Sequence, residues 1–157
     1  MRRRPNLGWL FVALILAAGA AVAWSLARQS GAERADPDDA PQVARGKPVY
    51  DRHCASCHGA NLEGQPRWQS RLPNGRMPAP PHDASGHTWH HPDELLFGMT
   101  KDGLVPGKYA PRGYQSDMPA FAGTLTDAEI WAVLAYIKSR WPPEIQRAQR
   151  ERRHVRR

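Results

Sequence analysis

The sequence predicts an all-α fold of three or four helices. Two stretches, residues 42–57 and residues 126–141, place apolar or small side chains at steps of three and four residues, which is typical of helices with one buried face. The segments between them are rich in Gly and Pro, as loops are. No alternation of apolar and polar residues typical of a β-strand precedes Cys54.

A short motif, Cys54-Ala55-Ser56-Cys57-His58, closes the first helical stretch and uses both of the chain's two cysteines. It has the form C-x-x-C-H, which is the attachment signature for one covalent haem c. Two thiols one helical turn apart can reach the two vinyl groups of a porphyrin as thioethers, and His58 can bind the iron as the proximal ligand. A thioredoxin-like dithiol is the alternative, but that motif belongs to a βαβ setting.

The N-terminal segment, residues 1–28, is expected to be a membrane anchor. Arg2-Arg3-Arg4 precede an apolar run from Trp9 to Ala27, close to the ~20 residues that cross a bilayer. A secretory signal peptide that is cleaved after Ser25-Leu26-Ala27 is the alternative. The arginines favour a cytoplasmic N-terminus, which places the protein in the inner membrane and its following domain in the periplasm or outside. Residues 29–41 are polar and predict a flexible tether.

The haem domain is expected to span residues 42–141, and its first helix carries a glycine on the buried stripe. Gly46 has no side chain, so it permits another helix to approach closely. Tyr50 follows four residues later on the same face. We expect Val133 and Tyr136, on the last helix of the domain, to pack against these two residues.

Residues 60–91 predict a long loop. Trp68 combines a large apolar body with one N–H donor, which suits a haem edge or a propionate. Arg67, Arg71 and Arg76 could neutralise propionates, and a solvated surface charge is the alternative for each of them. We list Arg67, Trp68 and Arg71 as expected propionate contacts.

A dense patch of histidines lies in this loop: His82, His87, His90 and His91. Neutral imidazole binds copper and zinc, so a second metal site is one interpretation of the patch. Hydrogen bonding within the loop is the other. A zinc site that joined the patch to Cys54 and Cys57 would need a longer gap between the two pairs than the usual ~12–15 residues.

The distal ligand of the iron is predicted to be Met118. Pro119 biases Met118 towards an extended backbone, which presents the thioether sideways. A thioether opposite an imidazole favours ferrous iron and raises the reduction potential. Met77 is also followed by proline, but it lies so soon after His58 that little chain is left to pass round a porphyrin. Met99 is expected to be a core residue.

Two more helices complete the domain. Residues 92–99 predict a short helix, with Pro92 at its start and acidic residues in its first turn. The last helix has Thr126 as N-cap and Glu129 at the capping-box position. Pro142-Pro143 ends or sharply kinks it.

The formal net charge of +7 is concentrated at the two ends of the chain. A nucleic-acid-binding domain carries a basic face, whereas residues 42–141 are close to neutral, so we expect no nucleic-acid partner. The basic tail, residues 142–157, could contact anionic lipid, contact an acidic partner, or serve only solubility. The sequence leaves these three roles open.

Several features follow one another in a set order: Gly46, Tyr50, Cys54-Ala55-Ser56-Cys57-His58-Gly59, Met118-Pro119 and Leu134-Ala135-Tyr136-Ile137. In this order residues 43–141 resemble class I c-type cytochromes, and residues 65–91 look more like the bacterial membrane-anchored monohaem members. The resemblance implies the cytochrome c fold and axial ligation by His58 and Met118. It also implies that a backbone carbonyl orients His58, with Ala60 at the position where the family has proline.

The expected function is outer-sphere electron transfer by a monohaem electron carrier in a respiratory or other periplasmic redox chain. Two axial ligands leave no position for a substrate, so the chain is not expected to be an enzyme. An electron-transfer subunit of a membrane dehydrogenase or oxidase complex is one alternative, and a haem-based sensor or peroxidase with a labile methionine is another. The sequence names neither the electron donor nor the acceptor.

Overall fold

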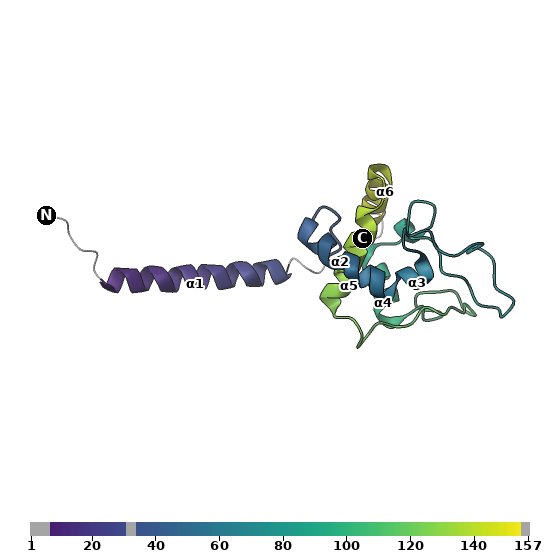
Figure 1. The fold of residues 1–157 in the computed structure, drawn as a ribbon, viewed down its shortest axis with the longest axis horizontal. Coiled ribbons are helices and arrows are strands. Elements are labelled where there is room, and N and C mark those ends of the chain that lie inside the picture. Colours follow the sequence, from purple (N-terminus) through teal and green to yellow (C-terminus); the bar gives the residue numbers. More distant parts are fainter. Residues whose placement is uncertain (1–6, 31–33, 155–157) are drawn as a thin grey trace. The chain divides into compact units, whose positions relative to one another are not determined.

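The computed structural model describes residues 7–30 and 34–154. The chain divides into two compact units, residues 1–33 and residues 34–157. The first unit holds α1 (Leu7–Ser30), which covers most of the predicted anchor (Figure 1). Arg2-Arg3-Arg4 lie outside the described residues. Among the residues that are described, no helix combines the length and the apolar character needed to cross a membrane.

Parts of the predicted tether, residues 29–41, are helical or make defined contacts in the structure. Helix α1 continues to Ser30, and Ala35 is buried in the core of the second unit. The side chain of Gln42 accepts a hydrogen bond from the backbone N–H of Asp36 at 2.9 Å and donates one to the carbonyl of Arg34 at 2.9 Å. The buried side chain of Gln42 thus satisfies backbone groups of Arg34 and Asp36, and the flexibility of residues 29–41 stays a prediction.

The cysteine motif lies at a break between two helices. Helix α2 (Ala40–His53) begins after the N-cap Asp39 and ends at Cys54. A single turn, α3 (Ala55–His58), follows at once. The sequence predicted one helix up to Cys57, and the structure interrupts it at Cys54, whose backbone N–H still bonds the carbonyl of Tyr50 at 2.9 Å.

Helices α2 and α5 (Asp127–Ser139) cross at the predicted glycine. A Cβ atom at Gly46 would overlap the backbone carbonyl of Ala132, so only glycine permits this approach. Beside the crossing, the rings of Tyr50 and Tyr136 lie 5.4 Å apart, and Val133 belongs to the same core cluster. The predicted helix crossing and the Thr126–Glu129 capping box are both confirmed.

The remaining elements are η1 (Thr88–His90), α4 (Asp93–Asp102) and α6 (Pro143–His154). Over residues 7–30 and 34–154 the structure contains helices and isolated β-bridges but no strand, which confirms the all-α prediction. In the second unit, long loops extend from the helices between α3 and α4 and between α4 and α5 (Figure 1).

A buried polar cluster joins three of these helices. Lys138 of α5 contacts both carboxylate oxygens of Asp93 at 2.9 Å and donates to the carbonyl of Ala35 at 2.6 Å. Gln149 of α6 is fully buried and donates to Asp93 at 2.7 Å and to the carbonyl of His91 at 3.2 Å. Helix α6, which holds most of the predicted basic tail (residues 142–157), therefore packs on the rest of the second unit through Gln149.

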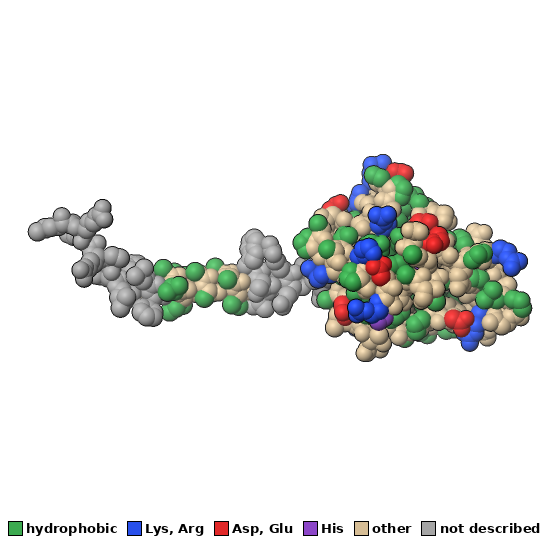
Figure 2. Space-filling view, viewed as in Figure 1, with side chains coloured by type: hydrophobic (Ala, Val, Ile, Leu, Met, Phe, Trp, Pro, Cys, Tyr) green, Lys and Arg blue, Asp and Glu red, His purple; other side chains and the backbone are tan. Residues whose placement is uncertain are grey.

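Charged side chains of both signs are mixed on the visible face of the second unit (Figure 2). Several form surface ion pairs, such as Lys47–Asp51 at 2.6 Å and Lys101–Asp127 at 2.7 Å. This mixture agrees with the near-neutral charge of residues 42–141.

Candidate functional site

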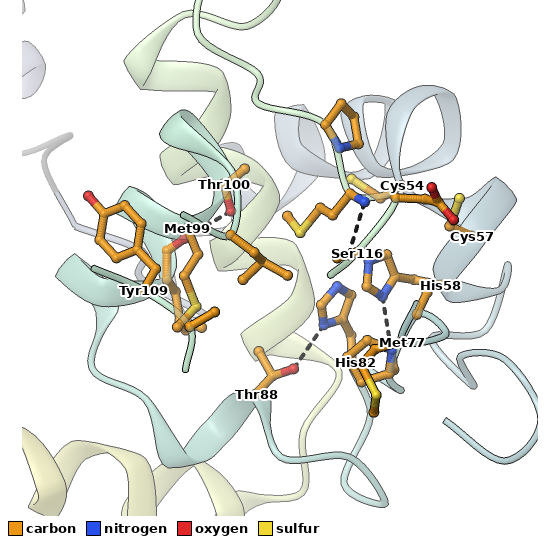
Figure 3. Close-up of a pocket in the computed structure, with 18 of the residues that line it drawn as sticks. Cys54, Cys57, His58, Met77, His82, Thr88, Met99, Thr100, Tyr109 and Ser116 are labelled. Carbon is orange, nitrogen blue, oxygen red and sulfur yellow. Dashed lines mark hydrogen bonds between the residues drawn. The ribbon is translucent and has the colours of Figure 1, made fainter. Parts of the chain in front are cut away.

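A cavity of about 350 Å³ opens in the second unit, within the ~300–1,000 Å³ range of cofactor sites. Cys54, Cys57 and His58 lie on one side of it, and Tyr109 lies on the other (Figure 3). Most of its remaining lining is apolar and comes from α4, α5 and the loops. The cavity therefore places reactive side chains against an apolar wall that excludes water.

The two thiols and the imidazole reach this cavity together because Cys54, Cys57 and His58 lie within one turn of the chain. The carbonyl of Cys54 accepts the backbone N–H groups of Cys57 at 3.1 Å and of His58 at 2.9 Å, which closes the turn. Both cysteines are free thiols. Burial, with a smaller effect of Cys57, raises the pKa of the Cys54 thiol to about 12. Cys57 is exposed, so the two thiols differ in their access to solvent.

The orientation of His58 is set by a proline that the sequence interpretation missed. The ring Nδ1 lies 2.8 Å from the carbonyl oxygen of Pro80. A carbonyl can only accept, so Nδ1 carries the hydrogen and the lone pair lies on Nε2. Burial lowers the pKa of His58 and the Pro80 bond opposes this, so the neutral ring is favoured. The residue that orients His58 is therefore Pro80 and not Ala60, because the loop returns to the imidazole twenty residues later than the family pattern suggested.

A second imidazole packs on the face of the first. The rings of His58 and His82 are stacked with their centroids 3.9 Å apart. The Thr88 hydroxyl lies 3.4 Å from the carbonyl of Pro81, to which it donates, so its oxygen accepts from Nδ1 of His82 at 2.9 Å. Burial, then His58 and His87, lowers the pKa of His82 well below its ordinary value. His82 is thus a neutral, fixed neighbour of His58, and no sequence signal beyond the histidine patch pointed to it.

The other histidines of the patch form ring contacts. His87 stacks on Trp68 with the centroids 5.4 Å apart, and His90 stacks on Trp89 at 3.7 Å. Over the described part of the chain, no group of three or more His, Cys, Asp or Glu residues is arranged to hold a metal ion. The described residues therefore give no support to the second metal site that the histidine patch suggested.

Met118 also lines the cavity and packs against the apolar core around α5. Its backbone N–H donates to the hydroxyl of Ser116 at 3.1 Å. Met77 and Met99 line the same cavity, so Met99 is not only a core residue as expected. The structure thus brings the predicted distal ligand to the cavity together with its alternative Met77 and with Met99.

The expected propionate contacts are not among the described residues that line the cavity. These contacts are Arg67, Trp68 and Arg71. Arg71 donates to the carbonyl of Gly75 at 2.6 Å and also lowers the pKa of Tyr114, which burial raises more strongly. Tyr114 does line the cavity, and Trp68 reaches its rim only through His87. The roles of Arg67, Trp68 and Arg71 stay predictions.

The side chains around the cavity fit haem c. Two free thiols, an imidazole with an available Nε2 and a thioether are the donors that such a group requires. Nδ1 of His58 is already satisfied by a backbone carbonyl, as in most histidines that bind a metal.

Comparison with known proteins gives the same result. The family model for cytochrome c matches residues 43–141. Cytochrome c-555 of Prosthecochloris aestuarii is 33% identical over 103 residues, which cover 60% of this chain and 84% of that protein. The Cbb3-type cytochrome c oxidase subunit CcoP of Azospirillum brasilense is 33% identical over 99 residues, which cover 63% of this chain and 28% of the relative.

A thiosulfate dehydrogenase of Stutzerimonas stutzeri (strain A1501) is 26% identical over 132 residues, which cover 82% of this chain and 37% of the relative. The chain therefore spans about a third of the length of the oxidase subunit and the dehydrogenase. No solved structure matches it significantly. From the cysteine motif, the cavity and these matches, we conclude that the chain belongs to the cytochrome c family and is a c-type cytochrome that carries covalent haem c and transfers electrons.

Proposed function

We propose that the protein is a monohaem electron carrier of a respiratory or other periplasmic redox chain, with Cys54 and Cys57 as the thioether attachments and His58 and Met118 as the axial ligands. The observation that carries the proposal is the shared cavity. His58, with Nδ1 held by Pro80, opens on the same space as both thiols and the Met118 side chain.

Haem c supplies an iron that takes up and releases one electron. His58 offers Nε2 to that iron, and the Pro80 carbonyl and the His82 ring restrict how the imidazole can turn. Met118 offers a soft thioether, which favours the ferrous state. The apolar lining excludes water, so charge is less well solvated there than in bulk. Two ligands that stay bound in both oxidation states give a small reorganisation energy and no substrate position, which is why we assign no enzymatic activity.

The propionate groups are proposed to meet Arg71, Trp68 and Arg67 at the cavity rim. Arg71 acts on Tyr114, which lines the cavity, and Trp68 covers His87, which also lines it. Both side chains are thus one residue away from the cavity.

Residues 1–28 are proposed to anchor the protein in the inner membrane, with residues 42–141 as the haem domain in the periplasm or outside. The support is the apolar run from Trp9 to Ala27 with three arginines before it. After high-salt washing, the full chain should stay with the membrane fraction and leave it only with detergent. Full-length protein in the soluble fraction would contradict the anchor, and a shortened soluble form would indicate a cleaved signal.

Spectroscopy of the holoprotein tests the ligand assignment. Met118→Ala should open the sixth position, lower the reduction potential and allow the ferrous protein to bind carbon monoxide. Met77→Ala should leave the low-spin spectrum unchanged, and loss of that spectrum in this variant would move the ligand to Met77. Replacing both Cys54 and Cys57 by alanine should prevent haem from staying with the denatured chain.

A second candidate function is that of an electron-transfer subunit of a membrane oxidase or dehydrogenase complex. The similarity to an oxidase subunit CcoP and to thiosulfate dehydrogenases supports it, although each match covers a minor part of the relative. Purification from native membranes distinguishes the two, because a subunit elutes with its enzyme at a fixed ratio and a carrier elutes alone. Rapid binding of carbon monoxide or turnover of peroxide by the unmodified protein would instead favour a sensor or peroxidase.

A further inference from the structure

The segment that carries Met118 is held from the opposite loop by an arginine. One guanidinium nitrogen of Arg76, Nη1, donates to the backbone carbonyl of Ser116 at 2.7 Å and contacts the Asp117 carboxylate at 2.9 Å. Beside it, the backbone N–H of Met77 donates to the carbonyl of Gln115 at 2.9 Å. The three residues immediately before Met118 are therefore all tied to residues 76 and 77.

Arg76 acts from a loop that is itself well connected. Its carbonyl accepts the backbone N–H of Leu72 at 2.8 Å, and its own N–H donates to the side chain of Asn74 at 3.1 Å. Further along, the carbonyl of Ala79 accepts the N–H of Gln65 at 2.9 Å. The next residue is Pro80, whose carbonyl orients His58. The loop that contains Arg76 and Pro80 thus contacts both the segment that carries Met118 and the ring of His58.

The bond to the Ser116 carbonyl is the contact that matters. The Arg76 side chain is 43% exposed and that of Asp117 is 69% exposed, so water screens their ion pair and its contribution is small. The hydrogen bond from the charged Arg76 donor to the Ser116 carbonyl does not require the Asp117 carboxylate, and it fixes the backbone directly. It leaves the path of residues 115–118 dependent on the Arg76 donor more than on the Asp117 charge.

We propose that Arg76 is a positioning residue that holds the 115–118 segment so that Met118 stays directed into the cavity. The inference rests on the proposed function, in which Met118 is the distal ligand. It assigns Arg76 a role other than the neutralisation of a propionate, because its guanidinium contacts Ser116 and Asp117 of the Met118 segment. Without Arg76, the segment should leave the cavity more often and open the sixth position of the iron.

The experiment measures how easily an added ligand displaces Met118 from the ferric holoprotein. Added imidazole binds only when the segment is displaced, so its apparent affinity reports the fraction of open molecules. Arg76→Ala removes a charge-assisted hydrogen bond at a partly exposed position, and we expect the apparent affinity for imidazole to rise about tenfold, equivalent to ~1.4 kcal/mol. The weak far-red absorption band of a ferric haem with a sulfur ligand should weaken in parallel.

Matched variants separate positioning from charge. Arg76→Lys keeps a charged donor and should restore the imidazole affinity at least in part, and Asp117→Asn should stay within about twofold of the parent because the Ser116 bond is intact. Arg112→Ala removes the same charge from an exposed position in the loop that also carries Met118, and it should leave the imidazole affinity unchanged. If Arg76→Ala does not accumulate, Arg76→Gln, whose side chain is too short to keep the carbonyl bond, should show the same rise.

Three outcomes would overturn the inference in distinguishable ways. An intact far-red band in Met118→Ala would show that Met118 is not the ligand, and the proposed function would fail together with the role of Arg76. Loss of the band in Met118→Ala, with parental imidazole affinity in Arg76→Ala or Arg76→Gln, would leave the ligand assignment intact and refute positioning by Arg76. An equal rise in Arg112→Ala would show a general charge effect and would also refute it.

Discussion

The buried contact between Lys138 and Asp93 allows a quantitative prediction about stability. The two side chains are 4% and 1% exposed, and Asp93 accepts two contacts from Lys138 and one bond from Gln149. Lys138→Met removes the cation that makes both of the 2.9 Å contacts with the buried carboxylate. Breaking a buried pair in this way costs about 3–5 kcal/mol, against a total domain stability of about 5–15 kcal/mol.

Urea unfolding of the holoprotein, followed by circular dichroism, measures this cost. With a slope near 2 kcal/mol per molar urea, a loss of about 4 kcal/mol lowers the midpoint by roughly 2 M. Lys101→Met is the matched control, because Lys101 pairs with the exposed Asp127. Water already solvates that pair, so the midpoint should hardly move.

The double variant Lys138→Met with Asp93→Leu separates the cost of an unpaired charge from the loss of packing. It should recover much of the lost stability, because neither charge is then buried alone. A fall of less than about 1 kcal/mol in Lys138→Met would refute the reasoning, since removing one partner of a buried ion pair should cost more than that. A double variant as unstable as the single one would show that shape, and not charge, governs the cluster.

Three further predictions follow from local features. Gly46→Ala should lower the melting temperature of the holoprotein with a loss of at least about 1–3 kcal/mol, because the added Cβ overlaps the rigid Ala132 carbonyl, and an unchanged melting temperature would contradict the close helix crossing. In the haem-free chain at about pH 8, iodoacetamide should modify the exposed Cys57 before Cys54, because burial raises the pKa of Cys54 to about 12; mass spectrometry that showed equal rates would argue against this difference. Burial raises the pKa of Tyr50 above its ordinary 10.0, so the unfolded chain loses this proton at a lower pH than the folded chain does. Stability should therefore fall as the pH rises past about 10, and Tyr50→Phe should reduce this dependence. The same slope of stability against pH in both proteins would refute the prediction.

Local patterns in the sequence were enough to predict the helices and the cofactor chemistry. The capping box at Thr126 and the glycine at position 46 both act on neighbouring backbone or on one facing helix. The spacing of Cys54 and Cys57 is set within a single turn, so it can be recognised without the rest of the fold. The prediction of a flexible tether came from composition alone, which does not reveal that Gln42 and Lys138 bind the backbone of residues 34–36.

The contacts around the predicted iron ligands, His58 and Met118, were harder to predict because they join loops. The carbonyl that orients His58 was expected at Ala60 and belongs to Pro80. The stacking of the His82 ring on His58 was not expected at all. For Arg76 the sequence left a propionate partner and a solvated surface charge open, and neither interpretation pointed to its bond with the Ser116 carbonyl. Each of these contacts depends on the path of a long loop, which turn residues and composition do not specify.

The sequence by itself determined that this chain is helical and carries the C-x-x-C-H motif for covalent haem c, because those properties depend on residues within one or two helical turns of each other. Only the tertiary structure decided which carbonyl orients His58, which arginine contacts the Met118 segment and where the C-terminal helix packs. The reason is physical: a hydrogen bond between distant segments requires both to arrive within about 3 Å, and that meeting is a result of the whole packing arrangement.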